Sequence, residues 1–230
     1  MGAKPQDCPT NSDEVSYPPA PWYLRGTAYL SLWQVRASRL PEASLSRAVR
    51  PRTLLGRVLV GTAFAVYEPE GMLAYDELLL AVQVSGGGPL SVSVPYIWVD
   101  HPASAAGARA LWSIPKQEAA FEVRRTHTAG EPDFEARAMT IQGALLADLR
   151  FQSRTTMPGR WPVRTRLMQH ALNNGGDRKP QVTEARAWAQ VSFGAASWNF
   201  ARSGPLSFLC GSSPLTSVRL TDMSLRIGSS

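Results

Sequence analysis

Apolar and polar residues alternate over much of the chain, and this alternation predicts a protein built mainly from short β-strands. The clearest example is 57–67, where valine recurs at positions 58, 60 and 66 and suits a pleated strand. The segment 73–84 is also compatible with a helix because leucine fills positions 78–80, but we interpret it as a strand. The predicted strands are 27–35, 57–67, 73–84, 90–99, 118–125, 134–142, 145–152, 163–168, 182–193 and 217–227.

Two short helices interrupt this pattern. The first is expected from Pro41 to about Val49, with a proline at the first helical position and an acid in the first turn. The second starts near Asp100-His101-Pro102 and covers the alanine-rich stretch up to Trp112. Segments 155–162 and 173–177 are expected to be loops, and the glycine triplet 86–88 indicates a hairpin turn, not a phosphate loop.

Many short strands without βαβ alternation predict a mainly β (α+β) fold, in which an antiparallel sheet forms a closed or double-layered β-barrel with one or two short helices. We expect one domain over residues 21–230. Residues 1–20, which end in a proline cluster, are expected to form a disordered arm. This arm lacks the apolar stretch of a signal peptide, and no run reaches the roughly 18 apolar residues of a membrane span, so a soluble, cytoplasmic protein is expected.

Composition excludes several function classes. The net charge of +6 comes from dispersed arginines without a nucleic-acid-binding signature, so we expect neither a nucleic-acid partner nor a membrane partner. Cys8 and Cys210 lie far apart, and no disulfide is expected between them. The histidines at 101, 127 and 170 have no metal-ligand spacing, so no metal is expected. Dinucleotide and serine-hydrolase motifs are also missing, and we expect no cofactor.

One lysine stands out in the segment Trp112-Ser113-Ile114-Pro115-Lys116. The chain has only three lysines, at positions 4, 116 and 179, against 21 arginines. Arginine cannot lose its proton in a protein, whereas burial can make a lysine amine neutral and therefore nucleophilic. Lys116 is thus a candidate reactive amine. The simpler alternative is a lysine whose ammonium reaches water from an apolar segment.

Several motifs in order resemble the acetoacetate decarboxylase superfamily, in a divergent branch. They are "PAPWYLRG" near residue 20, "YEPEGMLAYDELL" from Tyr67, Val99-Asp100 with Ser104, "ARALWSIPKQEAAF" up to Phe121, and the closing "PLTSVRLTDMSLRIG". Together they cover residues from about 19 to 228. The resemblance implies the barrel fold of that family and a homo-oligomer.

The same resemblance implies that Lys116 is a Schiff-base amine and that Glu77 is the acid facing it. We expect a substrate site that also includes Arg109, Arg25, Trp112, Gln117 and Tyr75. Arg25 lies next to the position of an early-strand arginine of the decarboxylases. Gln117 replaces the second lysine of the family's Pro-Lys-Lys, so burial alone would have to lower the pKa of the Lys116 amine.

Strand parity gives a conflicting expectation. In an unbroken strand from Pro115, Lys116 shares a face with Glu118 and Glu122 and would point to solvent. A glutamate such as Glu77 at the polar phase of a strand is also more often exposed than catalytic. Arg109, on a short helix, is more often a surface residue than a substrate clamp.

The sequence therefore predicts a cofactor-independent Schiff-base lyase, of decarboxylase or aldolase/dehydratase type, acting on a small oxo acid or ketone through Lys116. The alternative is a non-catalytic small-molecule-binding barrel that kept the fold and lost the chemistry. A basic module for acidic partners is a third interpretation.

Overall fold

The computed structural model describes residues 15–41, 45, 49–126, 132–170 and 180–229. The strands are β1 (Trp22–Arg36), β2 (Thr53–Leu54), β3 (Arg57–Tyr67), β4 (Tyr75–Gln83), β5 (Ser91–Val99), β6 (Lys116–Arg125), β7 (Phe134–Thr140), β8 (Leu145–Thr156), β9 (Trp161–Gln169), β10 (Gln181–Phe200) and β11 (Thr216–Ile227). The α-helix in this part is α1 (Pro102–Trp112), and short 3-10 turns lie at Ala37–Arg39 and Ser207–Leu209.

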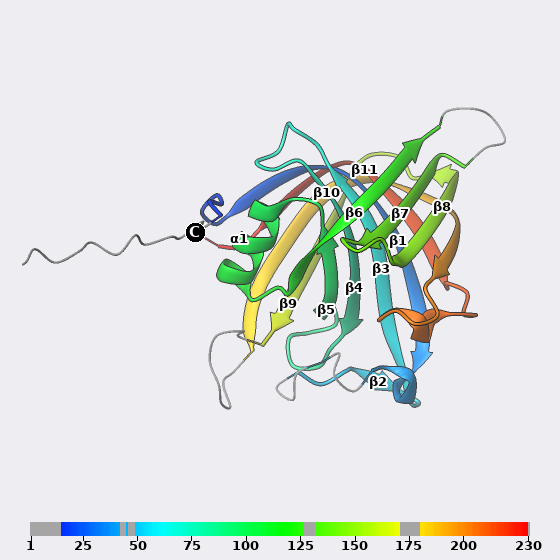
Figure 1. Ribbon diagram of the computed structural model, residues 1–230. Helices are drawn as coiled ribbons and strands as arrows, with labels where there is room; N and C mark the ends of the chain where they lie inside the picture. The colour runs from blue at the N-terminus through cyan, green and yellow to red at the C-terminus, as the bar shows by residue number, and fades with distance from the viewer. Residues whose placement is uncertain (1–14, 42–44, 46–48, 127–131, 171–179, 230) are drawn as a thin grey trace, which may run out of the picture.

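The strands form one sheet that closes on itself (Figure 1). Its order is β1-β11-β10-β8-β7-β6-β5-β4-β3, and pairing of β1 with β3 completes the ring. Strand β9 lies between β10 and β5, while β2 extends the edge beside β3. The predicted mainly β, closed barrel-like fold is therefore confirmed. Most pairs are antiparallel as expected, but β5 pairs in parallel with both β6 and β9.

Two apolar cores pack against opposite faces of the shared strands. On β4, Leu78 and Leu80 enter one core, with Phe64 and Phe134, whereas Tyr75 and Leu79 enter the other. A strand that is buried on both faces has no polar side, which explains the consecutive leucines at 78–80 without a helix. The second core also contains the inner side of α1.

Helix α1 lies on one side of the sheet, next to the start of β6 (Figure 1). It begins at the expected residues, because the His101 Nδ1 accepts a hydrogen bond of 3.2 Å from the Ala103 backbone N–H. Alanine and glycine on its inner face allow a close approach: a Cβ added to Gly107 would lie 2.5 Å from the Trp22 ring. Ser113, in the left-handed region at φ 54°, ends the helix.

Several predicted boundaries were wrong. The first strand starts at Trp22, and β10 continues to Phe200, well past the predicted end at 193. The segment 155–162, predicted as a loop, contains the end of β8 and the start of β9. Most of the predicted helix 41–49 and the whole predicted loop 173–177 lie outside the described residues, as does the arm up to residue 14. No helix in the described part is long and apolar enough to cross a membrane.

Candidate active site

Lys116 points into the protein, so the prediction from strand parity was wrong. Its side chain is 5% exposed, whereas the neighbouring Gln117 and Glu118 are exposed and Ala119 is buried again. The Lys116 N–H donates to the Ile114 carbonyl oxygen at 2.8 Å, which closes a tight turn at Pro115. Residues 116–118 then pair with β5, and pairing with β7 starts at Ala119. This change of partner strand breaks the alternation on which the parity argument relied.

The Lys116 Nζ has three polar partners in the described structure. It lies 2.7 Å from the Glu77 Oε2, and it donates to the Tyr75 hydroxyl at 3.0 Å and to the Ser104 Oγ at 2.9 Å. An ammonium group has three hydrogens, so these contacts occupy its donor capacity. The Glu77 side chain is 4% exposed and Ser104 is fully buried, so the alternative of a surface glutamate at position 77 was also wrong.

Two elements bring these partners to the amine. On β4, Tyr75 and Glu77 are two residues apart, and side chains at that spacing share one face of a strand. Ser104 comes from the first turn of α1, whose start is fixed by the His101 cap. A third element contributes Tyr67, which pairs with Tyr75 in the register of β3 and β4, with their ring centroids 4.6 Å apart.

Burial and the carboxylate of Glu77 are the main causes of the pKa shifts in this cluster. Burial lowers the pKa of the Lys116 amine, while the charge of Glu77 and its hydrogen bond act in the opposite direction. Burial raises the pKa of Tyr75 and Tyr67 well above the usual value, and the Glu77 carboxylate adds to both shifts. Both phenols are therefore neutral hydrogen-bond donors at physiological pH.

Comparison with protein families identifies the family of this chain. The model of the acetoacetate decarboxylase (ADC) family matches residues 50–198, more than half of the chain. The chain belongs to this family. The matched part contains Tyr67, Tyr75, Glu77, Ser104 and Lys116, which together form the buried cluster.

Solved structures with the same fold include proteins of this family. Acetoacetate decarboxylase from Legionella pneumophila is 13% identical with a TM-score of 0.66, and covers 99% of this chain and 96% of its own. An acetoacetate decarboxylase-like enzyme from Sphingomonas wittichii RW1 is 16% identical with a TM-score of 0.62, and covers 91% of each chain. The enduracididine biosynthesis enzyme MppR, complexed with pyruvate, is 14% identical with a TM-score of 0.63, and covers 95% of this chain and 91% of its own. Curated protein sequences gave no match.

The other residues expected at the site differ in how they lie relative to the Lys116 amine. The Arg109 guanidinium donates to the backbone oxygen of Lys116 at 2.7 Å, so it holds the start of β6. Trp112 is buried and packs edge-on against Trp22 at 4.8 Å. Gln117 is exposed on the face of β6 opposite Lys116, and Arg25 is exposed on β1. The structure thus brings Tyr75 to Lys116 and Glu77, but leaves Gln117 and Arg25 facing solvent.

Ser104 and Tyr67 were not identified as site residues from the sequence. Both lie in the motifs that carry the family resemblance, but nothing local distinguishes a buried serine on an alanine-rich helix from a packing residue. Tyr67 could have been found from the pairing of two strands, because it ends β3 and lies opposite Tyr75 at the start of β4.

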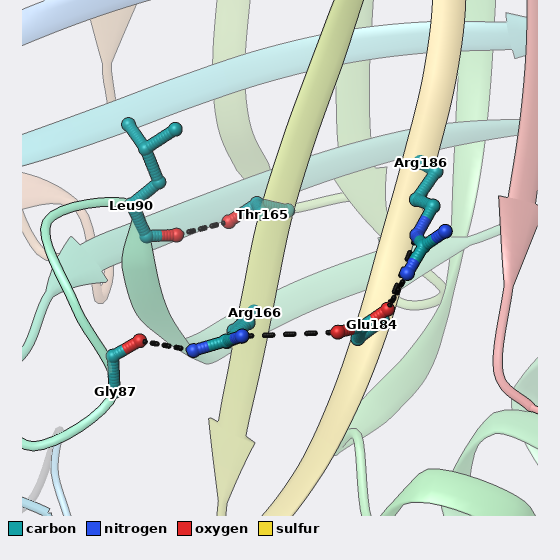
Figure 2. Close-up of polar contacts among 6 residues, drawn as sticks. All are labelled: Gly87, Leu90, Thr165, Arg166, Glu184 and Arg186. Atoms are coloured by element: carbon teal, nitrogen blue, oxygen red, sulfur yellow. Dashed lines mark hydrogen bonds and ion pairs between the residues drawn. The ribbon is translucent and has the colours of Figure 1, made fainter.

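Several arginines of this protein lie together on the outer face of β9 and β10, away from the Lys116 amine. Arg164, Arg186 and Arg226 lie directly opposite one another on β9, β10 and β11. Figure 2 shows how Glu184 interacts with two arginines here, Arg186 on its own strand at 2.5 Å and Arg166 on β9 at 3.8 Å. The Arg166 guanidinium also donates to the Gly87 oxygen at 3.0 Å (Figure 2).

Two hollows border this outer face. The larger, of about 520 Å³, is lined by residues that include Arg25, Arg186 and Trp188, and the smaller, of about 290 Å³, by residues that include Arg164 and Arg166. Neither is lined by Lys116. The outer arginines and the buried amine are therefore separate features of the protein.

Proposed function

We propose that this protein is a cofactor-independent Schiff-base lyase that acts on a small oxo acid or ketone through Lys116. The observation that supports it is the buried Lys116 Nζ between a carboxylate and two hydroxyl groups, at 2.7 to 3.0 Å from each. A lysine with a lowered pKa holds more of the neutral, nucleophilic form at physiological pH than an exposed lysine.

The first step makes the imine. Glu77 accepts a proton from the Lys116 ammonium, and the neutral nitrogen attacks the substrate carbonyl carbon. A C–N bond forms as the carbonyl π pair moves to oxygen, and the nitrogen passes one proton to that oxygen. The resulting hydroxyl group leaves as water when Glu77 returns its proton, which gives the iminium and restores the Glu77 carboxylate. Tyr75 and Ser104, both within hydrogen-bond reach of the nitrogen, are placed to donate to that oxygen.

The second step uses the iminium as an electron sink. Either a carboxylate leaves as carbon dioxide or an α-proton moves to a base, and in both cases the electron pair of the broken bond enters a C=C bond of the enamine. Glu77 is the base nearest the nitrogen among the described residues, and it returns the proton to carbon. Water then hydrolyses the iminium, which releases the product and the free amine.

Reductive trapping tests this proposal directly. The protein is treated with borohydride and a panel of oxo acids and ketones, and the peptides are analysed by mass spectrometry. Pyruvate is a sensible first probe, because the similar protein MppR was solved with it. We expect a reduced adduct on Lys116, and the other lysines, Lys4 and Lys179, serve as internal controls. Lys116→Arg should remove the adduct. A protein without any adduct on Lys116 across the panel would refute the imine mechanism.

The second candidate is a non-catalytic barrel that binds a small molecule. One observation favours it. The described part has five hollows of about 290 to 530 Å³ that could hold a small molecule, and Lys116 does not line them. In this case ligand binding would survive Lys116→Arg, and the wild-type protein would not form a reducible adduct.

A further inference from the structure

We infer that the buried amine site selects neutral carbonyl compounds over oxo acids. This inference rests on the imine chemistry proposed above and narrows its substrate class. It starts from the charges around Lys116, which are those of acids. Glu77 lies 2.7 Å from the Nζ, and the charged groups that act on Tyr75 are Glu77 and Asp100.

Comparison with another buried tyrosine shows that the charged side chains acting on the tyrosines near Lys116 are acidic. Tyr29, in the first core, is influenced by the cations Arg219 and Arg125 as well as by Asp133. The pKa of Tyr67 is raised by burial first and then by the charge of Glu77, with a contribution from Tyr75 in the same direction. The surroundings of Lys116 therefore differ in charge from the surroundings of Tyr29, where cations are present.

The two arginines expected at the site do not contact the amine. Arg109 is exposed, and one N–H of its guanidinium donates to the backbone oxygen of Lys116 at 2.7 Å. Arg25 is exposed and lines the outer hollow with Trp188. In the described structure, the polar partners of the Lys116 Nζ are the carboxylate of Glu77 and the hydroxyl groups of Tyr75 and Ser104.

The consequence follows from charge balance in the iminium intermediate. The iminium carries one positive charge and Glu77 one negative charge, so the pair is neutral. A carboxylate on the carbon next to the iminium would add a second negative charge within a few ångströms of Glu77, at a site shielded from water. An uncompensated buried charge is strongly unfavourable, whereas a neutral amide, ester or alkyl group at the same position is not.

A neutral substrate also defines the reaction that follows imine formation. Without a carboxylate there is no carbon dioxide to lose, and the bond that breaks is the α C–H bond. The proton moves to the Glu77 carboxylate, and the electron pair of that bond forms the enamine C=C bond as the iminium nitrogen becomes neutral. Reprotonation by Glu77 reverses the step, and attack of the enamine on a second carbonyl makes a new C–C bond of aldol type.

Pyruvate and pyruvamide provide a matched pair of probes, because they have nearly the same shape and differ in charge. Each is incubated with the wild-type protein and cyanoborohydride under identical conditions, and the rate of adduct formation on Lys116 is measured by mass spectrometry. The ratio of the two rates is divided by the same ratio for a small primary amine in solution, which removes the intrinsic difference in reactivity. We expect a corrected preference for pyruvamide of at least about tenfold.

The outcomes separate this inference from the proposed function. A corrected ratio near one, or a preference for pyruvate, would overturn the inference while the adduct itself upholds the imine mechanism. If neither probe gave an adduct, the inference and the proposed function would both be overturned.

Glu77→Gln supplies a second measurement, because removal of the carboxylate should bring the corrected ratio towards one. The ratio is unaffected by changes in the amine pKa, since both probes react with the same amine.

Exchange of the α-hydrogens provides an independent readout for the second step. In D₂O, the wild-type protein should catalyse deuterium incorporation into the methyl groups of acetone, as measured by NMR. Glu77→Gln should retain an acetone adduct but lose at least about tenfold of the exchange rate, because the base is missing. Equal exchange by the variant would contradict the assigned role of Glu77.

Discussion

The Lys116 Nζ and the Glu77 Oε2 are 2.7 Å apart, in side chains that are 5% and 4% exposed. The pair joins β6 to β4, although these strands are separated in the sheet by β5. A buried ion pair contributes little net stability compared with apolar residues of similar volume, but the loss of one partner leaves an uncompensated charge. The fold is therefore expected to be sensitive to the loss of either partner alone.

Lys116→Met should destabilise the fold, because the Glu77 carboxylate would remain buried without its cation. We expect a decrease of about 3–5 kcal/mol in the free energy of unfolding, measured by urea denaturation at pH 8. The double variant Lys116→Met with Glu77→Gln should recover much of that loss. An exposed pair provides the control: Arg137→Ala, which removes an ion pair with Asp148, should lower the free energy of unfolding far less than Lys116→Met does, because solvent screens an exposed pair. A double variant as unstable as Lys116→Met would contradict this explanation.

The sequence was sufficient to predict strands whose pattern of apolar residues and flanking turns is local. The segment 57–67 was predicted to the residue, because β-branched residues and the turns on either side define it. The leucines at 78–80 were ambiguous, since burial on both faces of β4 depends on two cores formed by distant strands.

The orientation of Lys116 is a clearer example of what the sequence did not contain. Its burial depends on the local turn at Pro115 and on the change of pairing from β5 to β7, and the pairing involves residues far away in the chain. Lys116 and Glu77 were nevertheless identified as candidates, because the family motifs carry them. The placement of Gln117 on the opposite face follows from the same local geometry.

Gln117→Lys should leave the reactivity of Lys116 unchanged. A lysine at position 117 would extend into solvent on the other face of β6, where water and salt screen its charge. The measurement is the pH at which Lys116 reacts at half its maximal rate with an amine-modifying reagent, and we expect a shift below about 0.3 units. Glu77→Gln is the comparison, and it should lower that pH because the Glu77 carboxylate raises the Lys116 pKa. Equal shifts in the two variants would show that position 117 acts directly on the amine.

The ionised form of Asp76 should make the fold less stable at neutral pH than at acidic pH. Burial, and then the charge of Asp100, raise the pKa of Asp76 to about 6. The folded protein therefore holds the Asp76 proton more tightly than the unfolded chain, whose carboxyl has a pKa of about 3.9. Stability falls as the pH rises from about 4 through 6, and the full penalty is present above that range.

Asp76→Asn removes this penalty. Because Asp76 is only partly buried, we expect a modest gain of about 1 kcal/mol at pH 7.5, which disappears near pH 4. Chemical denaturation at both pH values provides the measurement. Asp222→Asn serves as the control, since Asp222 is exposed and pairs with Arg160, and its loss should change stability by at most about 0.5 kcal/mol without a gain at pH 7.5. A gain from Asp76→Asn that is the same at pH 4 would exclude ionisation as its cause.

Gly107→Ala decides between helix propensity and packing. In an isolated helix, alanine is more favourable than glycine by about 1 kcal/mol. In this protein the added Cβ would lie 2.5 Å from the Trp22 Cζ2 and 3.0 Å from the Tyr17 Cβ, and Trp22 is fixed by a 2.8 Å hydrogen bond to the Pro18 oxygen. Overpacking of a well-filled core typically costs about 1–3 kcal/mol, so packing should outweigh propensity.

We therefore expect Gly107→Ala to lower the melting temperature and to slow adduct formation on Lys116, because displacement of α1 moves Ser104 away from the amine. Gly61→Ala is the matched control: it lies in β3, and its added Cβ meets no atom within 4 Å. That substitution should be neutral or slightly stabilising, because alanine restricts the unfolded chain more than glycine does. If Gly107→Ala proved as stable as Gly61→Ala, the close contact between α1 and Trp22 would not be what sets the position of the helix.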